Sequence, residues 1–208
     1  DDGEQVLMVG HVRREVAALR HLQVWVALAT TMLGFGGVFV VLTYIAPILE
    51  EVTGLAPRSV TLVLFLFGLG LTIGNALGGR LADKALMPAL IGGLAVLAAV
   101  MLVFAATMHA AVIAIVTIFA WGVAAFATIP GLQTRVVEKA REAPNLAASL
   151  NIGAFNLGNA IGAALGGGLI GAGFSYPAVA VAGAAMSGCG CLLAILGRAM
   201  DARSPAAG

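Results

Sequence analysis

The stretch Asn145 to Gly173, NLAASLNIGAFNLGNAIGAALGGGLIGAG, decides the fold, because it is uncharged and long enough to form a transmembrane helix. Gly158, Gly162 and Gly166 recur at every fourth residue, so they share one helix face. Small residues in such a row let a neighbouring helix approach to backbone contact. Asn151 falls on nearly the same face. The stretch therefore predicts a helix that packs closely against another helix inside a membrane.

Asn156 and Asn159 fall away from the glycine row, and Ser149 lies on nearly the same side as Asn156. An unpaired amide is costly in hydrocarbon, so this polar face is expected to meet another helix or a water-filled cavity. Both interpretations, hydrogen bonding between helices and lining of a cavity, stay open at this point.

The composition predicts a polytopic membrane protein. Mean hydropathy is +1.03 and 10% of the residues are charged, against about 25% in an ordinary soluble domain. The net charge of +1 argues neither for nor against a nucleic-acid partner, and none is expected. The histidines lack metal-ligand spacing, and Cys189 and Cys191 point apart on a helix, so neither a metal site nor a disulfide is predicted.

Uncharged runs of helix length predict six transmembrane spans, each ended by charged residues or by proline and glycine. Pro47 is expected to end the first span, and Pro130 with Gly131 the fourth. Gly171 to Pro177 is the expected corner between the fifth and sixth. The predicted segments are a cytoplasmic linker end at 1–21, a six-helix domain at 22–198 with spans at about 22–47, 59–79, 86–107, 110–131, 146–170 and 175–197, and a cytoplasmic tail at 199–208.

The distribution of positive charge predicts the orientation. Six spans place both termini on the same side of the membrane, and ten of the eleven Lys and Arg residues fall on that side, with Arg58 opposite. Because positive residues gather in cytoplasmic loops, both termini are predicted to be cytoplasmic. The chain begins at Asp1 with no signal-peptide pattern, so we expect no signal peptide and an N-terminus that lies within a longer sequence.

Three sequence matches in the same order relate the first three spans to the last three: GNALG at 74–78 with GNAIG at 158–162, Gly37-Val38 and Thr43 with Gly122-Val123 and Thr128, and Pro88-Ala89 with Pro177-Ala178. Because three is odd, the two units would cross the membrane in opposite senses. The predicted fold is thus an all-α membrane protein made of two inverted three-helix repeats, an arrangement that builds secondary transporters.

The stretch Gly79-Arg80-Leu81-Ala82-Asp83-Lys84 resembles the second copy of the cytoplasmic G-x-x-x-D-R/K loop motif of the major facilitator superfamily, although Leu86 stands where that family has a further glycine. Residues 149–168 are similar to the penultimate helix of its efflux proteins. Over roughly residues 20–198 the chain resembles the carboxy-terminal six-helix half of a twelve-helix drug–proton antiporter of the sugar and chloramphenicol efflux type.

This resemblance implies a transporter in a bacterial inner membrane that exports a drug or sugar-like small molecule by alternating access and proton antiport, with no cofactor and with the proton gradient as driving force. It implies a conformational role for the loop motif residues Gly79, Arg80, Asp83 and Lys84; alternatively, these charges only keep a loop hydrated. All ten acidic residues lie in loops or at chain ends, so the coupling carboxylate is implied to belong to an amino-terminal six-helix half, which this chain lacks.

The first, second, fourth and fifth spans are expected to line a cavity for the substrate. The polar and aromatic candidates for its wall are Tyr44, Asn75, Trp121, Asn156 and Asn159. The residues predicted to pack helices are Gly70, Gly74, Gly78, Gly158, Gly162 and Gly166. The expected partners are the lipid bilayer, the missing half and the small-molecule substrate.

Other functions fit less well. No span holds a nucleophile with a base or a metal cluster, so no catalytic residue and no enzyme activity is predicted. A pore would need rings of like charge or a filter loop, and neither is evident. The alternative that stays open is a six-helix membrane assembly partner or sensor without transport activity of its own.

Overall fold

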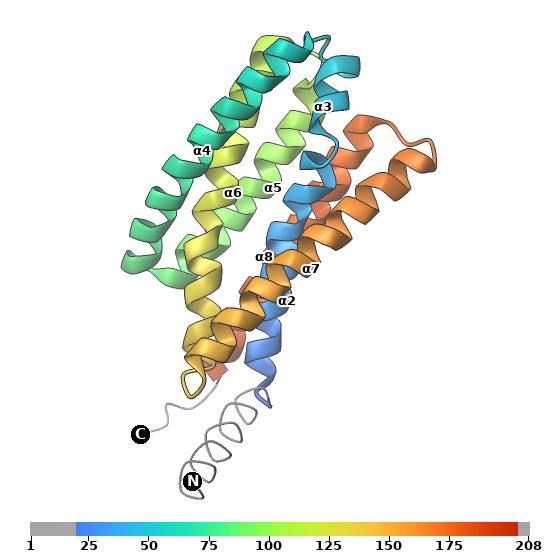
Figure 1. Cartoon of the computed structure of the whole chain (residues 1–208). Helices are drawn as coiled ribbons and strands as arrows, with labels where there is room; N and C mark the ends of the chain where they lie inside the picture. The colour runs from blue at the N-terminus through green and yellow to red at the C-terminus, as the bar shows by residue number, and fades with distance from the viewer. Residues whose placement is uncertain (1–19, 204–208) are drawn as a thin grey trace, which may run out of the picture.

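The computed structural model describes residues 20–203, and this part of the chain is an all-helical bundle without strands (Figure 1). Residues 1–19 of the predicted linker end and residues 204–208 of the predicted tail lie outside the described residues. The all-helical class is confirmed. The helices are α2 (Leu22–Leu42), α3 (Ile45–Pro47), the π-helical η1 (Ile48–Val52), α4 (Pro57–Lys84), α5 (Leu86–Thr107), α6 (Ala111–Lys139), α7 (Pro144–Gly171) and α8 (Tyr176–Arg203).

Five of the described helices, namely α2, α4, α5, α6 and α8, are long and apolar enough to cross a membrane. Helix α7 has 28 residues, as many as α4 and α8, and carries no charge. It is not among the five because its asparagines and glycines lower its hydropathy. Length and hydropathy together therefore support five of the six predicted spans, and α7 falls short in hydropathy and not in length.

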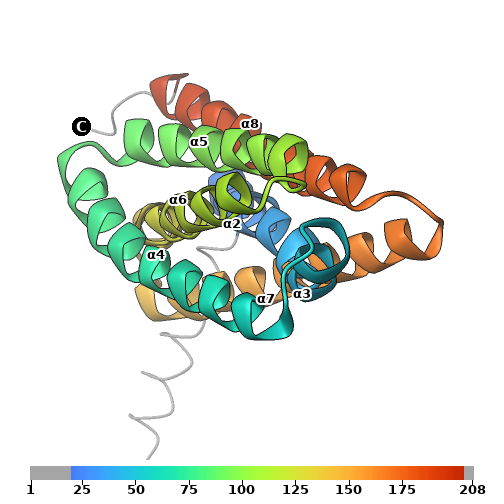
Figure 2. The same ribbon diagram turned by 90° about the horizontal axis from the view of Figure 1, so that it is seen from above.

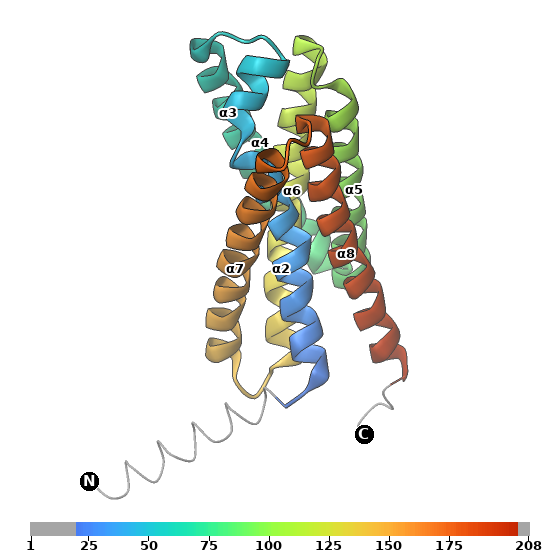
Figure 3. The same ribbon diagram turned by 90° about the vertical axis from the view of Figure 1, so that its right-hand side faces the viewer.

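Helices α2 and α6 occupy the middle of the bundle (Figure 2). Helix α2 packs along α7 and α8, whereas α6 packs along α4 and α5, and α5 also packs along α8. The largest fully buried side chains, among them Trp121, Phe104 and Met101, fill the space between these helices. The start of α2 and the end of α8 lie at the same end of the bundle (Figure 3).

The prediction that Pro47 ends the first helix is wrong. Helix α2 stops at Leu42, and Thr43 and Tyr44 form a turn before α3. Pro47 has no amide hydrogen to donate to the carbonyl of Thr43, and its ring crowds that carbonyl. The break therefore falls one turn before the proline, and the chain continues through η1 to Val52.

The prediction that Pro130 and Gly131 end the fourth helix is also wrong, because α6 runs through both residues to Lys139. Proline removes one backbone hydrogen bond, but packing of the following residues against neighbouring helices can preserve the helix. Gly131 and Leu132 are both buried. As a result, Arg135 and Lys139 lie on the last turns of α6.

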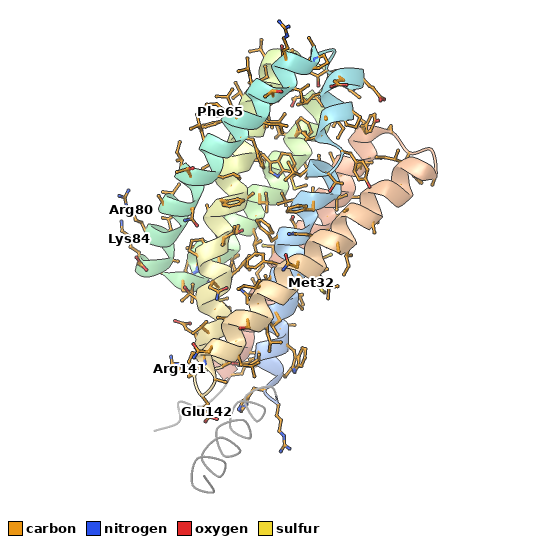
Figure 4. All side chains as sticks on the ribbon, viewed as in Figure 1. Met32, Phe65, Arg80, Lys84, Arg141 and Glu142 are labelled. Atoms are coloured by element: carbon orange, nitrogen blue, oxygen red, sulfur yellow. The ribbon has the colours of Figure 1, made fainter. Side chains whose placement is uncertain are left out.

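The loop motif residues Gly79, Arg80, Asp83 and Lys84 likewise lie on the last turns of α4, and the only residue between α4 and α5 is Ala85. The prediction of a charged loop here is therefore wrong in its secondary structure. Figure 4 shows Arg80 and Lys84 pointing away from the bundle at this end of α4. The corner between α7 and α8 contains Gly173 with φ +83°, a left-handed conformation that glycine adopts without strain.

Candidate functional site

A cavity of about 380 Å³ lies among α2, α4, α6 and α7. These are the first, second, fourth and fifth long helices, the ones that the sequence analysis assigned to a cavity wall. Its lining consists of five phenylalanines, four aliphatic residues and one amide: Phe35, Phe39, Phe67, Phe126, Phe155, Val38, Leu42, Leu71, Ile129 and Asn159.

Phe35 is at the centre of the aromatic part of the wall and is 5% exposed. Its ring centroid lies 5.1 Å from that of Phe155 on α7 and 5.9 Å from that of Phe126 on α6, both edge to face. Phe39 is 6.1 Å away on the same helix. Ring pairs at these distances attract one another beyond their apolar contact, so three helices meet through aromatic contacts at the cavity.

Asn159 on α7 supplies the one polar side chain of the lining. Its Oδ1 is buried and has no hydrogen-bond partner among the described residues. Buried polar atoms in folded proteins nearly always have such a partner, so an orphaned oxygen at a cavity needs an explanation. A group that enters the cavity and donates a hydrogen bond would provide one.

The other four predicted cavity residues do not line this cavity. Trp121 is fully buried behind the wall, with ring centroids 5.2 Å from Phe67 and 6.1 Å from Phe104. The hydroxyl of Tyr44 donates to the carbonyl of Ala163 at 2.8 Å and so joins the end of α2 to α7. The side chains of Asn75 and Asn156 are exposed on α4 and α7.

The sequence did not reveal the five phenylalanines as cavity residues, because a phenylalanine in an apolar helix is indistinguishable from an ordinary core or lipid-facing residue. A weak signal was present, since Phe35 with Phe39, and Phe155 with Asn159, lie four residues apart on their helices. This spacing places each pair on one face, but it does not show that the faces converge.

The predicted packing glycines lie against the backbones of α2 and α6. A Cβ atom added to Gly158, Gly162 or Gly166 would collide with the carbonyl oxygens of Met32, Gly36 and Val40 on α2. A Cβ added to Gly70, Gly74 or Gly78 would collide with the carbonyl oxygens of Phe119, Val123 and Ala127 on α6. Both outer helices therefore approach a central helix to backbone contact, which holds the cavity wall together.

Asn151 is fully buried on the glycine face of α7, where it makes hydrogen bonds to two other helices. Thr31 Oγ1 on α2 donates to Asn151 Oδ1 at 2.7 Å, and Asn151 Nδ2 donates to Gln133 Oε1 on α6 at 2.6 Å. For this asparagine the structure places the amide between helices rather than in a cavity. Its hydrogen bonds fix α7 against α2 and α6 on one side of the wall.

An ionic cluster joins the ends of α6 and α8. Arg135 Nη1 lies 2.7 Å from Asp201 Oδ2, and Lys139 Nζ lies 2.5 Å from Asp201 Oδ1. Arg135 is 6% exposed, so its guanidinium depends on this carboxylate for compensation of its charge.

We expect Asp201→Asn to lower the free energy of unfolding by about 1–3 kcal/mol, below the range for fully buried pairs because Asp201 is partly exposed. Thermal unfolding of the purified protein in detergent measures this loss. Glu142→Gln, at an exposed acid just beyond α6, is the matched control and is expected to change little. Equal melting temperatures for the two variants would contradict the structural role of the cluster.

Comparison with known proteins identifies relatives for most of the chain. Residues 7–145 match the family described as Major Facilitator Superfamily. The chain is 46% identical over 185 residues to the inner membrane transport protein YdhP of Escherichia coli K12. The aligned segment covers 89% of this chain and 48% of that protein.

Two further relatives carry names that mention a transported compound or a resistance. One is a probable sugar efflux transporter of Helicobacter acinonychis, 28% identical over 65% of this chain and 34% of that protein. The other is a chloramphenicol resistance protein of Streptomyces lividans, 32% identical over 73% of this chain and 38% of that protein. The chain spans about half the length, or less, of the curated relatives that it matches.

Proposed function

The chain belongs to the major facilitator superfamily, a family of transporters and not of enzymes, and from this premise we propose that it forms the carboxy-terminal six-helix half of a secondary active transporter. In this proposal it exports a small molecule across the bacterial inner membrane by alternating access and proton antiport. The observation that carries the proposal is the cavity among α2, α4, α6 and α7, with its orphaned amide oxygen.

The packing of the helices supports two inverted three-helix repeats in which α7 also spans the membrane, as the fifth of six spans in chain order. Helix α2 of the first unit packs along the second and third helices of the other unit, and α6 does the same in return. The glycine contacts follow the same exchange, because Gly158 meets Met32 as Gly74 meets Val123. By these contacts, Met32 in the first unit occupies the position equivalent to Val123 in the second. The sequence match instead made Gly37 equivalent to Gly122, so the two alignments of the units differ in register.

Several features favour an amino-terminal half as the partner. The chain spans about half of the relatives' length, and none of the cavity-lining residues is titratable, so we place the coupling carboxylate in that other half. Asn75 and Asn156 expose amides that are costly in lipid, so we propose that they face the other half or the substrate path. We also propose that both ends of the chain are cytoplasmic, because ten of its eleven Lys and Arg residues fall on that side of the six spans.

The end of α4 is the proposed contact that changes between conformations. Arg80, Asp83 and Lys84 are exposed there and make no ion pair among the described residues, so their charges are available to the other half. A carboxylate such as Asp83 can accept hydrogen bonds from the amides at a neighbouring helix N-terminus, where the helix dipole favours an anion. Such a contact would hold one conformation closed.

Accessibility of the cavity tests alternating access. We would replace Cys189 and Cys191 by serine in the full-length protein, introduce Asn159→Cys, and measure its labelling by a membrane-impermeant maleimide with and without an imposed proton gradient. Labelling is expected to change several-fold with the gradient, because the gradient shifts the population between the two conformations. Phe65→Cys, on the outward face of α4 (Figure 4), is the control and should not respond.

Proton-driven flux is the second readout of this experiment. Everted membrane vesicles that contain the protein are expected to accumulate its substrate, and a protonophore should abolish the accumulation. Labelling that ignores the gradient, together with the absence of any proton-dependent flux, would contradict the proposal and favour the assembly partner or sensor.

A further inference from the structure

We infer that the cavity among α2, α4, α6 and α7 binds an uncharged, largely apolar molecule with an aromatic ring and a hydrogen-bond donor, and that sugars and organic cations fit it poorly. This inference rests on the proposed function, because it takes this cavity as part of the substrate path. It narrows the substrate to one chemical class, which neither the family nor the names of its members do.

The aromatic part of the wall favours a guest with a ring. Phe35 already meets Phe126 and Phe155 edge to face, and Phe39 on α2 and Phe67 on α4 complete the aromatic part of the lining. An additional ring packed at similar distances gains about 0.5–1.5 kcal/mol per aromatic pair beyond the burial of its surface. The volume of about 380 Å³ lies in the range of small-molecule sites.

The orphaned oxygen favours a guest with a hydrogen-bond donor. Asn159 Oδ1 is buried without a partner in the described part of the chain, and leaving such an acceptor unsatisfied costs about 1–3 kcal/mol. A hydroxyl or N–H group on the guest would remove this cost. A guest without a donor would leave the oxygen as it is, so the donor contributes to selectivity as well as to affinity.

A sugar fits this wall poorly. Each of its hydroxyls loses hydrogen bonds to water on entry, and each one left without a partner costs about 1–3 kcal/mol. The single amide of Asn159 offers few hydrogen bonds, and the other nine lining residues offer no polar side-chain atoms. The hydroxyls of a sugar that lie against this wall would thus mostly face phenylalanine and aliphatic side chains.

An organic cation also fits poorly. Attraction between a cation and a phenylalanine ring contributes about 0.5–2 kcal/mol, less than the several kcal/mol that removal of an ion from water costs. None of the described residues that line this wall carries a carboxylate, so the wall itself offers a cation no opposite charge. The acidic residues of the described part lie at helix ends or in the connections there: Glu50, Glu51, Asp83, Glu138, Glu142 and Asp201.

Binding of four probes to the purified full-length protein tests the inference. The probes are 2-naphthol, 2-methoxynaphthalene, glucose and the cation tetraphenylphosphonium, and equilibrium dialysis measures their affinity. The first two share the aromatic rings and differ in the hydrogen-bond donor. We expect 2-naphthol to bind about tenfold more tightly than 2-methoxynaphthalene, equivalent to about 1.4 kcal/mol, and the other two probes to bind more weakly than both.

Four variants assign this selectivity to the cavity. Asn159→Leu is expected to abolish the difference between the two naphthalenes, and Phe155→Leu is expected to weaken both. Asn145→Leu, in the first turn of α7, and Phe65→Leu, on the outward face of α4, are the matched controls and should retain the wild-type affinities. They also correct for partition of the probes into detergent.

Binding of glucose or tetraphenylphosphonium that is tighter than binding of 2-naphthol would overturn the inference. A preference for 2-naphthol over 2-methoxynaphthalene that survives in Asn159→Leu would also overturn it. These outcomes are distinct from failure of the proposed function. A protein whose Asn159→Cys labelling responds to the gradient, but which prefers glucose, is a transporter with another substrate class. A protein that shows the naphthol preference without gradient response or flux has the inferred cavity chemistry but does not transport.

Discussion

Gly162→Leu is expected to lower the free energy of unfolding by about 3 kcal/mol, at the upper end of the usual range for overpacked cores. The first atom of the new side chain would already collide with the carbonyl oxygen of Gly36, and Val40 N lies 3.1 Å from the same point. Both are backbone atoms of α2, so neither can rotate away, and the two helices must separate.

Gly153→Leu is the matched control on the same helix, because a Cβ atom there meets nothing within 4 Å. Both substitutions raise the hydropathy of α7 by the same amount, so any effect on membrane insertion is common to the two variants. Thermal unfolding of the purified full-length protein measures the difference. A melting temperature of Gly162→Leu that equals that of Gly153→Leu would show that α7 does not lie at backbone contact with α2.

The proposed repeat extends this prediction to α4. Gly78 lies against the carbonyl of Ala127 on α6 as Gly162 lies against that of Gly36 on α2. Gly78→Leu is therefore expected to be about as destabilising as Gly162→Leu, with Gly68→Leu as its control in open space on α4. A large loss for one glycine and none for the other would contradict equivalent packing in the two units.

Trp121→Ala is expected to lower the free energy of unfolding by about 3–5 kcal/mol, the range for removal of a large buried aromatic side chain. Trp121 is 0% exposed, and its ring packs between Phe67 and Phe104. Its Nε1 has no hydrogen-bond partner among the described residues, so the loss comes from packing alone. Phe174→Ala is the control, since that side chain is 56% exposed.

Substitutions at Trp121 also distinguish a packing role from the role in the cavity wall that the sequence suggested. Trp121→Phe retains an apolar ring and is expected to lose less stability than Trp121→Ala, with little change in the affinity for 2-naphthol. If Trp121→Ala were as stable as the wild type but altered ligand binding, the indole would contact the ligand directly and its burial behind the wall would be the wrong interpretation.

The helix boundaries show where local sequence signals fail to predict the structure. Pro47 and Pro130 carry the same signal, yet the helix breaks before Pro47 and continues through Pro130. A proline removes the same hydrogen bond in both places, so its neighbours decide the outcome. Gly131 and Leu132 after Pro130 are buried, but so are Ile48 and Leu49 after Pro47, so the two outcomes depend on how whole helices pack, which no local signal encodes.

The candidate site shows the same limit. Asn156 and Asn159 were equivalent in the sequence, because each was an amide away from the glycine row. In the structure Asn159 lines the cavity with an orphaned oxygen, whereas Asn156 is exposed. The difference depends on which helices lie beside α7, and helix periodicity gives only the direction of a side chain.

The sequence by itself determined the helical class, the approximate position of each long helix and the glycine faces, because hydropathy, charge and periodicity act within a few turns of one helix. Only the tertiary structure decided that Phe35, Phe126 and Phe155 converge on one cavity and that Trp121 lies behind it. These residues come from different helices, and their contacts arise only when α7 closes on α2 and α4 closes on α6. Convergence of faces depends on the packing of whole helices, which no local pattern encodes.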